Sequence, residues 1–254
     1  FACTSFVDAQ IGRLIDQVDR MGISEDTYFI YISDHGFHLG EQNHWGKTTL
    51  YESSLNSPLI ISRKGMDNEG AVSKSLVEYV DILPTVLDLA GIQIPAHIEG
   101  VSTVPLLKDP GMEFKKAVFS RQERDAIGRR KGYSVRTVRY RYTEWHDHEA
   151  GVVMARELYD LISDPMEMNN LAIYPEHEAL VQEMAGILEA GWEKALPDGV
   201  INRSRNPVAP PAYSWGPEGV PRRKLWHEVY GGDESERWRK AVERRVSIED
   251  EISP

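Results

Sequence analysis

The sequence contains little cysteine, no long apolar run and no excess of positive charge, and each absence excludes a class of protein. Cys3 is the only cysteine among 254 residues, so an intrachain disulfide and a cysteine-based zinc site are both excluded. No apolar run approaches the roughly 20 residues of a membrane-spanning helix. The formal net charge of −11 argues against a general nucleic-acid or membrane-surface binder, although an anionic substrate needs only local positive charge.

Other familiar signatures are missing as well. The sequence has no internal repeat, no Gly-rich phosphate loop and no assignable Ser/His/Asp constellation. With 41% hydrophobic and 27% charged residues, its composition is that of an ordinary globular protein. The chain starts at Phe1 without an initiator Met, and a helical stripe of apolar residues begins almost at once. We therefore expect a fragment or a processed product.

Apolar spacing predicts α/β architecture over residues 1–111. Residues 6–21 carry apolar side chains at spacings of three and four, which predicts an amphipathic helix. The β-prone runs at 28–32 and 57–62 predict strands, and the first is apolar enough to be covered on both faces, as in a parallel sheet. Residues 72–90 predict a second helical face, interrupted by Pro84.

The pattern changes after residue 111. Residues 112–195 predict an α+β subdomain, with a small antiparallel sheet of short strands between 117 and 161 and a covering helix at 180–192. Residues 196–254 are rich in proline and predict an extended arm with one charged helix at 234–245.

The candidate site lies at the end of the first predicted strand, where Ser33-Asp34-His35-Gly36 is followed by the lone Lys47. Ligands of open α/β sheets bind outside the carboxyl ends of the strands. Asp34 can bind a hard divalent cation, and His35 can add a second ligand or donate to a substrate. Lys47 can hold a tetrahedral anion, and Gly36 allows a sharp backbone turn. The simpler interpretations are a turn or cap for Asp34 and a solvated surface side chain for Lys47.

Several motifs resemble the C-terminal part of the sulfatase family. They are Ser33-Asp34-His35-Gly36, Leu39-Gly40-Glu41, Trp45-Gly46-Lys47 with the following Glu52, and Ser57-Pro58-Leu59-Ile60. Residues 5–12, 80–91 and 157–171 are similar to further family segments, and residues 132–145 resemble the C-terminal sheet of iduronate-2-sulfatase and its bacterial relatives. The resemblance covers about residues 5–190 and implies the alkaline-phosphatase-like α/β sandwich.

The resemblance also implies a function, a sulfuric ester hydrolase acting on a sulfated small molecule or glycan. Asp34 and His35 fall where the family places two ligands of a calcium ion. Lys47 falls where a lysine binds the sulfate group, and His35 and Lys47 are the implied catalytic residues. By resemblance, the compartment would be periplasmic, extracellular or lysosomal.

The nucleophile of the family is missing from the sequence. Sulfatases attack with a formylglycine made from the Cys of a Cys-x-Pro-x-Arg motif, and Cys3 is followed by neither the Pro nor the Arg. A packed thiol at the start of a helix is the simpler interpretation of Cys3. We therefore expect formylglycine in a missing N-terminal part, supplied by a partner chain or segment, and no activity in the isolated chain.

Two other functions remain open. One is a phosphodiesterase or phosphonate monoester hydrolase of the same superfamily, and the other is a truncated, non-catalytic remnant that binds a glycan or a partner. Residues 121–145 contain eight Arg or Lys against three Asp or Glu, which indicates either a rim that recruits polyanionic sugar or a solvated face. His146, Asp147 and His148 indicate a pocket wall or, more simply, a surface turn.

Overall fold

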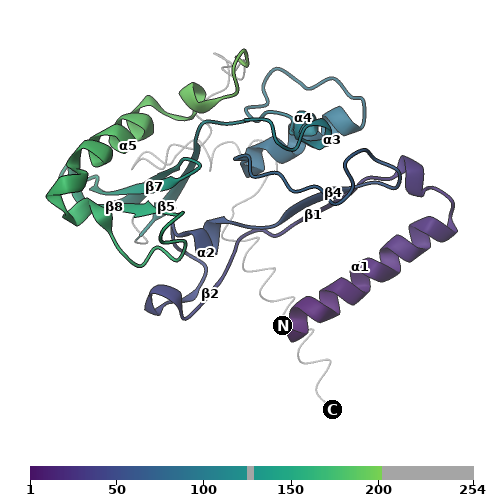
Figure 1. The fold of residues 1–254 in the computed structure, drawn as a ribbon, viewed down its shortest axis with the longest axis horizontal. Coiled ribbons are helices and arrows are strands. Elements are labelled where there is room, and N and C mark those ends of the chain that lie inside the picture. Colours follow the sequence, from purple (N-terminus) through teal and green to yellow (C-terminus); the bar gives the residue numbers. More distant parts are fainter. Residues whose placement is uncertain (125–128, 202–254) are drawn as a thin grey trace, which may run out of the picture. The chain divides into compact units, whose positions relative to one another are not determined.

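The computed structural model describes residues 1–124 and 129–201. The part of the predicted arm beyond residue 201, with its charged helix, lies outside the described residues. Four α-helices, four strands and three 3₁₀ helices make up the described chain before residue 112 (Figure 1). In chain order they are α1 (Ala2–Arg20), η1 (Ser24–Asp26), β1 (Phe29–Ile32), β2 (His38–Leu39), η2 (Glu41–Asn43), β3 (Trp45–Gly46), α2 (Glu52–Leu55), β4 (Leu59–Ser62), η3 (Tyr79–Asp81), α3 (Ile82–Leu89) and α4 (Val104–Lys108).

The two predicted strands exist, but the parallel sheet expected for them is wrong. β1 and β4 pair antiparallel, with Phe29 opposite Ser62 and Ile32 opposite Leu59. Between them the chain reverses through a short hairpin and α2, without the long crossover helix that parallel neighbours need. An apolar run indicates burial on two faces but does not encode the direction of the neighbouring strand.

Part of the β1–β4 pair is uncovered in the described chain. The side chains of Tyr31, Ile32 and Ile60 are 37%, 43% and 56% exposed. α1 likewise buries none of its residues, and Cys3 at its start is exposed, so the packing predicted for this thiol is wrong. No helix in the described part of the chain is long and apolar enough to cross a membrane.

The second predicted helix is much shorter than its apolar pattern suggests. Leu76 lies in a non-helical segment and forms an isolated antiparallel bridge with Lys115. α3 begins only at Ile82, which places Pro84 in its first turn. Proline lacks the N–H that a helix interior needs, but the N–H groups of the first turn have no partner within the helix, so Pro84 does not interrupt α3.

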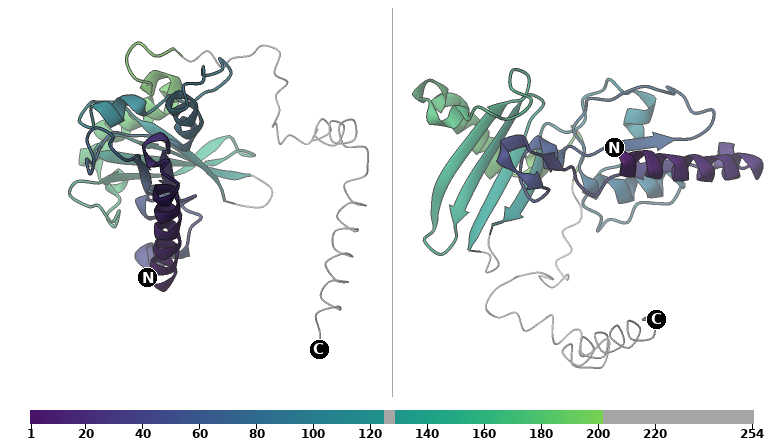
Figure 2. Two further views of the ribbon diagram at one scale, coloured as in Figure 1. Left: turned by 90° about the vertical axis from the view of Figure 1, so that its right-hand side faces the viewer. Right: turned by 90° about the horizontal axis from the view of Figure 1, so that it is seen from below.

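The small antiparallel sheet and the covering helix predicted within residues 112–195 are present. β5 (Val118–Glu123), β6 (Arg130–Arg136), β7 (Tyr140–Asp147) and β8 (Val152–Asp160) form a four-stranded antiparallel sheet in that order. Figure 2 shows these strands side by side with α5 (Glu178–Ala190) against them. The remaining elements are η4 (Leu171–Ile173), η5 (Pro175–His177) and η6 (Trp192–Ala195).

The core of this subdomain lies between α5 and one face of the sheet. Its buried members come from both layers: Ala117, Val135, Tyr142, Leu158, Val181, Met184 and Ala195. Val135 and Tyr142 face each other across β6 and β7. The opposite face of the sheet carries buried polar side chains, including Ser134, Arg141 and Thr143, and it contacts the segment that follows Lys47.

Candidate active site

Asp34 and His35 form a close pair directly after β1. The His35 Nδ1 atom lies 2.6 Å from the Gly36 carbonyl oxygen. A carbonyl only accepts, so Nδ1 must carry a proton and donate it. The other ring nitrogen, Nε2, lies 3.2 Å from Asp34 Oδ2. In a neutral ring Nε2 is also an acceptor, so the two atoms attract only when a proton or a metal cation lies between them.

The exposure of the pair suits a ligand. The Asp34 side chain is 80% exposed and the His35 side chain is 30% exposed. The carboxylate therefore has room to bind an added cation, and the bond from Nδ1 to the backbone fixes the ring so that Nε2 points at the carboxylate. The structure brings these two predicted residues together.

Gly36 is required for a reason other than the one predicted. Its backbone is not in the left-handed region. Instead, a Cβ atom at this position would lie 2.1 Å from the Ser53 carbonyl oxygen. The Gly36 N–H donates to the Ser54 carbonyl at 2.7 Å. Gly36 thus allows the strand end that carries Asp34 and His35 to lie directly on α2.

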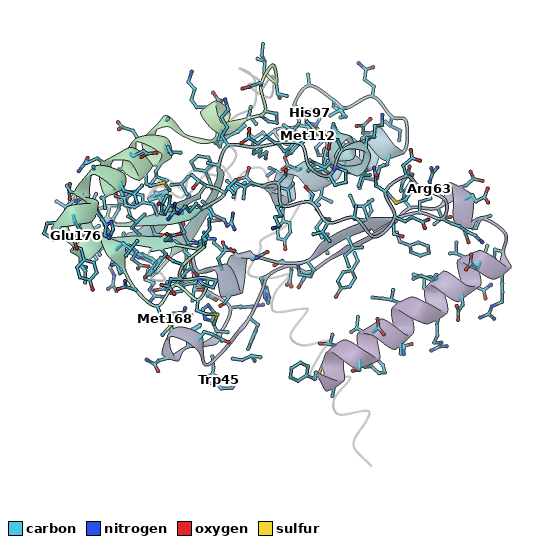
Figure 3. The ribbon with its side chains drawn as sticks, viewed as in Figure 1. Trp45, Arg63, His97, Met112, Met168 and Glu176 are labelled. Carbon is cyan, nitrogen blue, oxygen red and sulfur yellow. The ribbon has the colours of Figure 1, made fainter. Side chains whose placement is uncertain are left out.

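Lys47 follows a short hairpin that is held by hydrogen bonds of the buried His38 side chain. β2 and β3 pair at His38 with Gly46 and at Leu39 with Trp45, and the His38 side chain is fully buried. The His38 Nε2 atom lies 2.7 Å from Thr49 Oγ1, and the Thr49 hydroxyl donates to Ser54 Oγ at 2.8 Å. Lys47 comes directly after β3 with an exposed side chain. Trp45 in β3 is 72% exposed (Figure 3).

The Asp34 carboxylate suits a calcium ion, whereas His35 offers a nitrogen, and the two residues supply only part of a metal site. Calcium takes six to eight oxygen ligands, carboxylates prominent among them. In the described residues, no group of three or more His, Cys, Asp or Glu side chains converges to hold a metal ion. Asp34 and His35 can therefore contribute two ligands to a shell that other groups must complete.

The sequence motif included Glu52 but did not indicate its role, which is to bind two arginines of the C-terminal sheet. Its carboxylate accepts from Arg136 Nε at 2.6 Å and also binds Arg141. Glu167 joins the group, because it lies 2.8 Å from Arg141 Nε and accepts the Glu52 N–H at 2.6 Å. The partners lie more than 80 residues further along the chain, so no local pattern could have indicated them.

Burial and charge act in opposite directions on the two carboxyls. Burial pushes the pKa of Glu52 upward, but Arg141 and Arg136 outweigh it and hold that pKa below its usual value. Burial raises the pKa of Glu167 to about 7, against the lowering effect of Arg141. Glu52 is therefore the ionised partner of the two arginines.

The basic stretch at 121–145 is partly neutralised within the chain. The pairs include Arg121 with Glu123, Arg129 with Asp147, Arg136 and Arg141 with Glu52, and Arg139 with Asp160. Recruitment of polyanionic sugar by this stretch stays a prediction.

His146 and Asp147 are the last two residues of β7, and the turn predicted for this segment begins only at His148. The Arg129 guanidinium holds the pKa of Asp147 at about 2, and the Asp147 carboxylate accepts from two backbone N–H groups, those of Glu149 and Ala150. His146 binds Glu144 at 2.8 Å, and His148 Nε2 lies 3.0 Å from Tyr133 Oη. The pocket-wall alternative stays a prediction for the two histidines.

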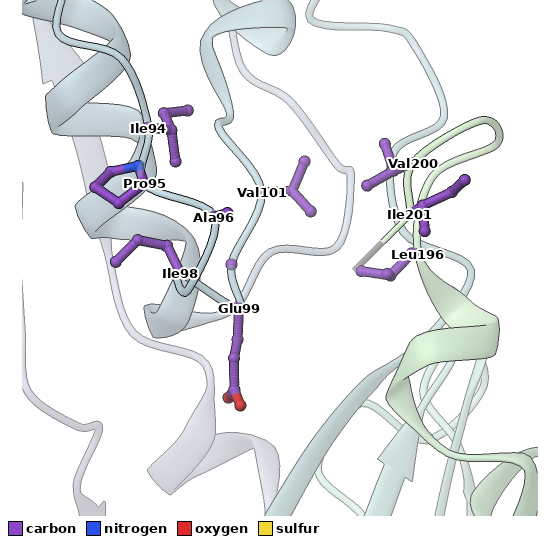
Figure 4. Close-up of a pocket in the computed structure, with 10 residues that line it drawn as sticks. Ile94, Pro95, Ala96, Ile98, Glu99, Val101, Leu196, Val200 and Ile201 are labelled. Atoms are coloured by element: carbon purple, nitrogen blue, oxygen red, sulfur yellow. The ribbon is translucent and has the colours of Figure 1, made fainter. Parts of the chain in front are cut away.

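A small pocket lies elsewhere, between residues 94–101 and 196–201 (Figure 4). Its lining is mostly apolar, and its charged member is Glu99. An acidic side chain disfavours an anionic group, so this pocket does not suit a sulfate.

Solved structures define the class of fold. A protein from Bacteroides fragilis has a TM-score of 0.69 at 22% identity over 81% of this chain and 42% of its own. At that identity the likeness concerns the fold alone, which is the alkaline-phosphatase-like α/β fold of the sulfatases.

Sequence comparison then identifies the family. Residues 40–194 match the family model described as N-sulphoglucosamine sulphohydrolase, C-terminal. The chain belongs to the sulfatase family. It is 31% identical over 188 residues to an N-acetylglucosamine-6-O-sulfatase of Bacteroides thetaiotaomicron, covering 72% of this chain and 33% of that protein. It is 32% identical over 198 residues to arylsulfatase K of Bos taurus, covering 74% of this chain and 36% of that protein.

Two solved relatives show the range of the matches. One, in complex with its substrate D-glucosamine-2-N,6-O-disulfate, has a TM-score of 0.65 at 31% identity over 72% of this chain and 37% of its own. The other is the phosphonate monoester hydrolase of Agrobacterium radiobacter, with a TM-score of 0.62 at 30% identity over 72% of this chain and 38% of its own. The chain spans about a third of the length of the curated relatives named above.

Proposed function

We propose that this chain is the C-terminal part of a sulfatase that hydrolyses sulfate esters of glycans or small molecules. The observation that carries the proposal is the Asp34–His35 pair, in which two acceptor atoms face each other at 3.2 Å beside an exposed carboxylate. This pair stands in a chain of the sulfatase family, ahead of an exposed Lys47. The glycan substrate is supported by the relative solved with a disulfated glucosamine.

Each residue has a distinct role in this proposal. Asp34 and His35 Nε2 would supply two ligands to a calcium ion, which when bound would polarise the sulfate oxygens. Lys47 places an ammonium group against the sulfate and offsets the negative charge that grows on its oxygens as the ester bond breaks. The bond from His35 Nδ1 to Gly36 keeps the lone pair of Nε2 directed at the site.

The attacking group and the rest of the metal shell belong to a separate N-terminal part in this proposal. The family's nucleophile is a formylglycine, and Cys3 lacks the motif that would produce it. Exposed apolar side chains on α1, such as Phe6 at 67% and Leu14 at 57%, support a partner segment that covers them. The isolated chain should then hydrolyse no sulfate ester, and a periplasmic, extracellular or lysosomal compartment stays a proposal from family resemblance.

Lys47→Met tests the sulfate-binding role. In the protein that joins this chain to its N-terminal part, we expect kcat/KM for an aryl sulfate to fall about 100-fold, because removal of one preorganised cationic donor from a developing oxyanion costs roughly that much. Release of inorganic sulfate is the measurement. Lys64→Met is the matched control, since Lys64 is 64% exposed and pairs only loosely with Asp19 at 3.6 Å. Equal rates for wild type and Lys47→Met would contradict the role.

A phosphonate monoester hydrolase is the second candidate, because one such enzyme matches at 30% identity. The same cation and lysine would stabilise a phosphorus oxyanion. Turnover of an aryl sulfate, a phosphodiester and a phosphonate monoester by the assembled protein discriminates between the two functions. A preference for the sulfate supports the first candidate, and no turnover of any of them supports a non-catalytic remnant.

A further inference from the structure

The segment that follows Lys47 is held by the C-terminal sheet at every second residue. The first contact is a hydrogen bond from Gln122 on β5, whose Nε2 donates to the Thr48 carbonyl at 2.6 Å. Gln122 is only 9% exposed. Among the described residues its Oε1 has no partner. Turning the amide group by half a turn would place Oε1 against the Thr48 carbonyl oxygen, and two acceptors repel. The bond to Thr48 therefore fixes the orientation of this side chain.

The second contact is apolar and depends on a missing side chain. Leu50 is 5% exposed and lies over Gly132 in β6. A Cβ atom at Gly132 would come within 2.6 Å of Leu50 Cδ1 and 2.7 Å of the Trp145 ring. Gly132 does not have a left-handed φ. Glycine is needed at this position because a side chain would collide with Leu50 and Trp145.

The third contact is the ionic group at Glu52, which joins α2 to Arg136 and Arg141. Residues 48, 50 and 52 are thus bound by β5, β6 and β7. Lys47 is the residue immediately before the first of these contacts. A lysine side chain loses conformational entropy when it binds an anion in one geometry. If the backbone beside Lys47 is already fixed, no further backbone entropy is lost on binding.

We propose that Gln122 is a positioning residue for Lys47, and that the C-terminal sheet holds the Lys47 backbone in place for an anionic sulfate. This inference rests on the sulfate-binding role of Lys47 proposed above. Gln122 does not touch the substrate in this scheme. It acts through the Thr48 carbonyl, one peptide away from Lys47.

Gln122→Met is the direct test, because it keeps the length of the side chain and removes the donor. Gln182→Met on α5 is the matched control, since the Gln182 amide is exposed and bonds only its neighbour Glu178. In the chain itself, we expect amide hydrogen exchange at Thr49, whose N–H donates to the Lys47 carbonyl at 3.0 Å, to become at least about tenfold faster in Gln122→Met and to stay unchanged in Gln182→Met. In the assembled protein, we expect kcat/KM for an aryl sulfate to fall about tenfold.

A double-mutant cycle separates positioning from a general structural role. If Gln122 acts through Lys47, adding Gln122→Met to Lys47→Met should lower kcat/KM no further. An equal loss with and without Lys47 would overturn the inference. If Lys47→Met alone leaves turnover unchanged, the sulfate-binding role itself fails, which is a different outcome.

Gly132→Ala gives a second route should Gln122→Met fail to fold. Gly132 is paired with Gln122 across β5 and β6, and the added methyl group would push on Leu50 from the same sheet. We expect the same Lys47-dependent fall in kcat/KM, and a loss that does not depend on Lys47 would again overturn the inference.

Discussion

Lys115→Met should lower the free energy of unfolding by about 4 kcal/mol, because it leaves the buried Asp81 carboxylate and the partly buried Glu78 carboxylate without their cation. The Lys115 ammonium lies 2.7 Å from Glu78 Oε2 and 2.8 Å from Asp81. Lys115 is 4% exposed and Asp81 is fully buried. The same carboxylates also bind backbone: Asp81 accepts the Val101 N–H, and Glu78 accepts the Phe119 N–H. Urea unfolding of the chain, followed by circular dichroism, measures the loss.

Lys116→Met is a control at the next position. Lys116 pairs with Asp198 at 2.8 Å, but the two side chains are 64% and 90% exposed. Exposed ion pairs contribute little, so this variant should change the stability only slightly. Adding Asp81→Asn to Lys115→Met should recover part of the loss, since it removes one of the unpaired charges. Equal effects of Lys115→Met and Lys116→Met would show that the buried group contributes nothing special.

Gly36→Ala should be the most damaging substitution near the candidate site, with a loss of about 3 kcal/mol in the free energy of unfolding. The new methyl group would lie 2.1 Å from the Ser53 carbonyl oxygen and 3.2 Å from Ser54 Cα. Both contacts are backbone, so neither can move aside as a side chain would. The hydrogen bond from Gly36 N–H to Ser54 would be lost with the shift. Thermal melting of the chain measures the effect.

Gly186→Ala is the matched control for this substitution. Gly186 lies within α5, and a Cβ atom there would meet nothing within 4 Å. Alanine favours a helix over glycine by about 1 kcal/mol, so this variant should raise the melting temperature. A Gly36→Ala protein as stable as wild type would contradict the close approach of α2 to the strand end.

The sequence predicted the elements whose residues show a local periodic pattern. The four strands of the small sheet and its covering helix follow from alternation and helical spacing, and the structure contains them at β5 to β8 and α5. Asp34 and His35 were identified as a pair because they follow a β-prone run, and the structure brings them into contact.

The features that were missed depend on distant residues. The direction of β4 relative to β1 is set by how the chain returns, which the apolar run does not record. The need for glycine at position 36 comes from Ser53, which approaches through the fold. The partners of Glu52 lie on β6 and β7. Each of these contacts joins segments that no sequence window contains together.

The most direct test of the proposed function is release of inorganic sulfate from an aryl sulfate, measured against calcium concentration with the assembled protein. Comparing wild type with Asp34→Asn isolates the metal-binding role, because the amide keeps the shape of the side chain and removes its charge. The proposal predicts calcium-dependent sulfate release by wild type and a calcium affinity on the order of 100-fold weaker in Asp34→Asn. Sulfate release with the same calcium dependence in both proteins would contradict it.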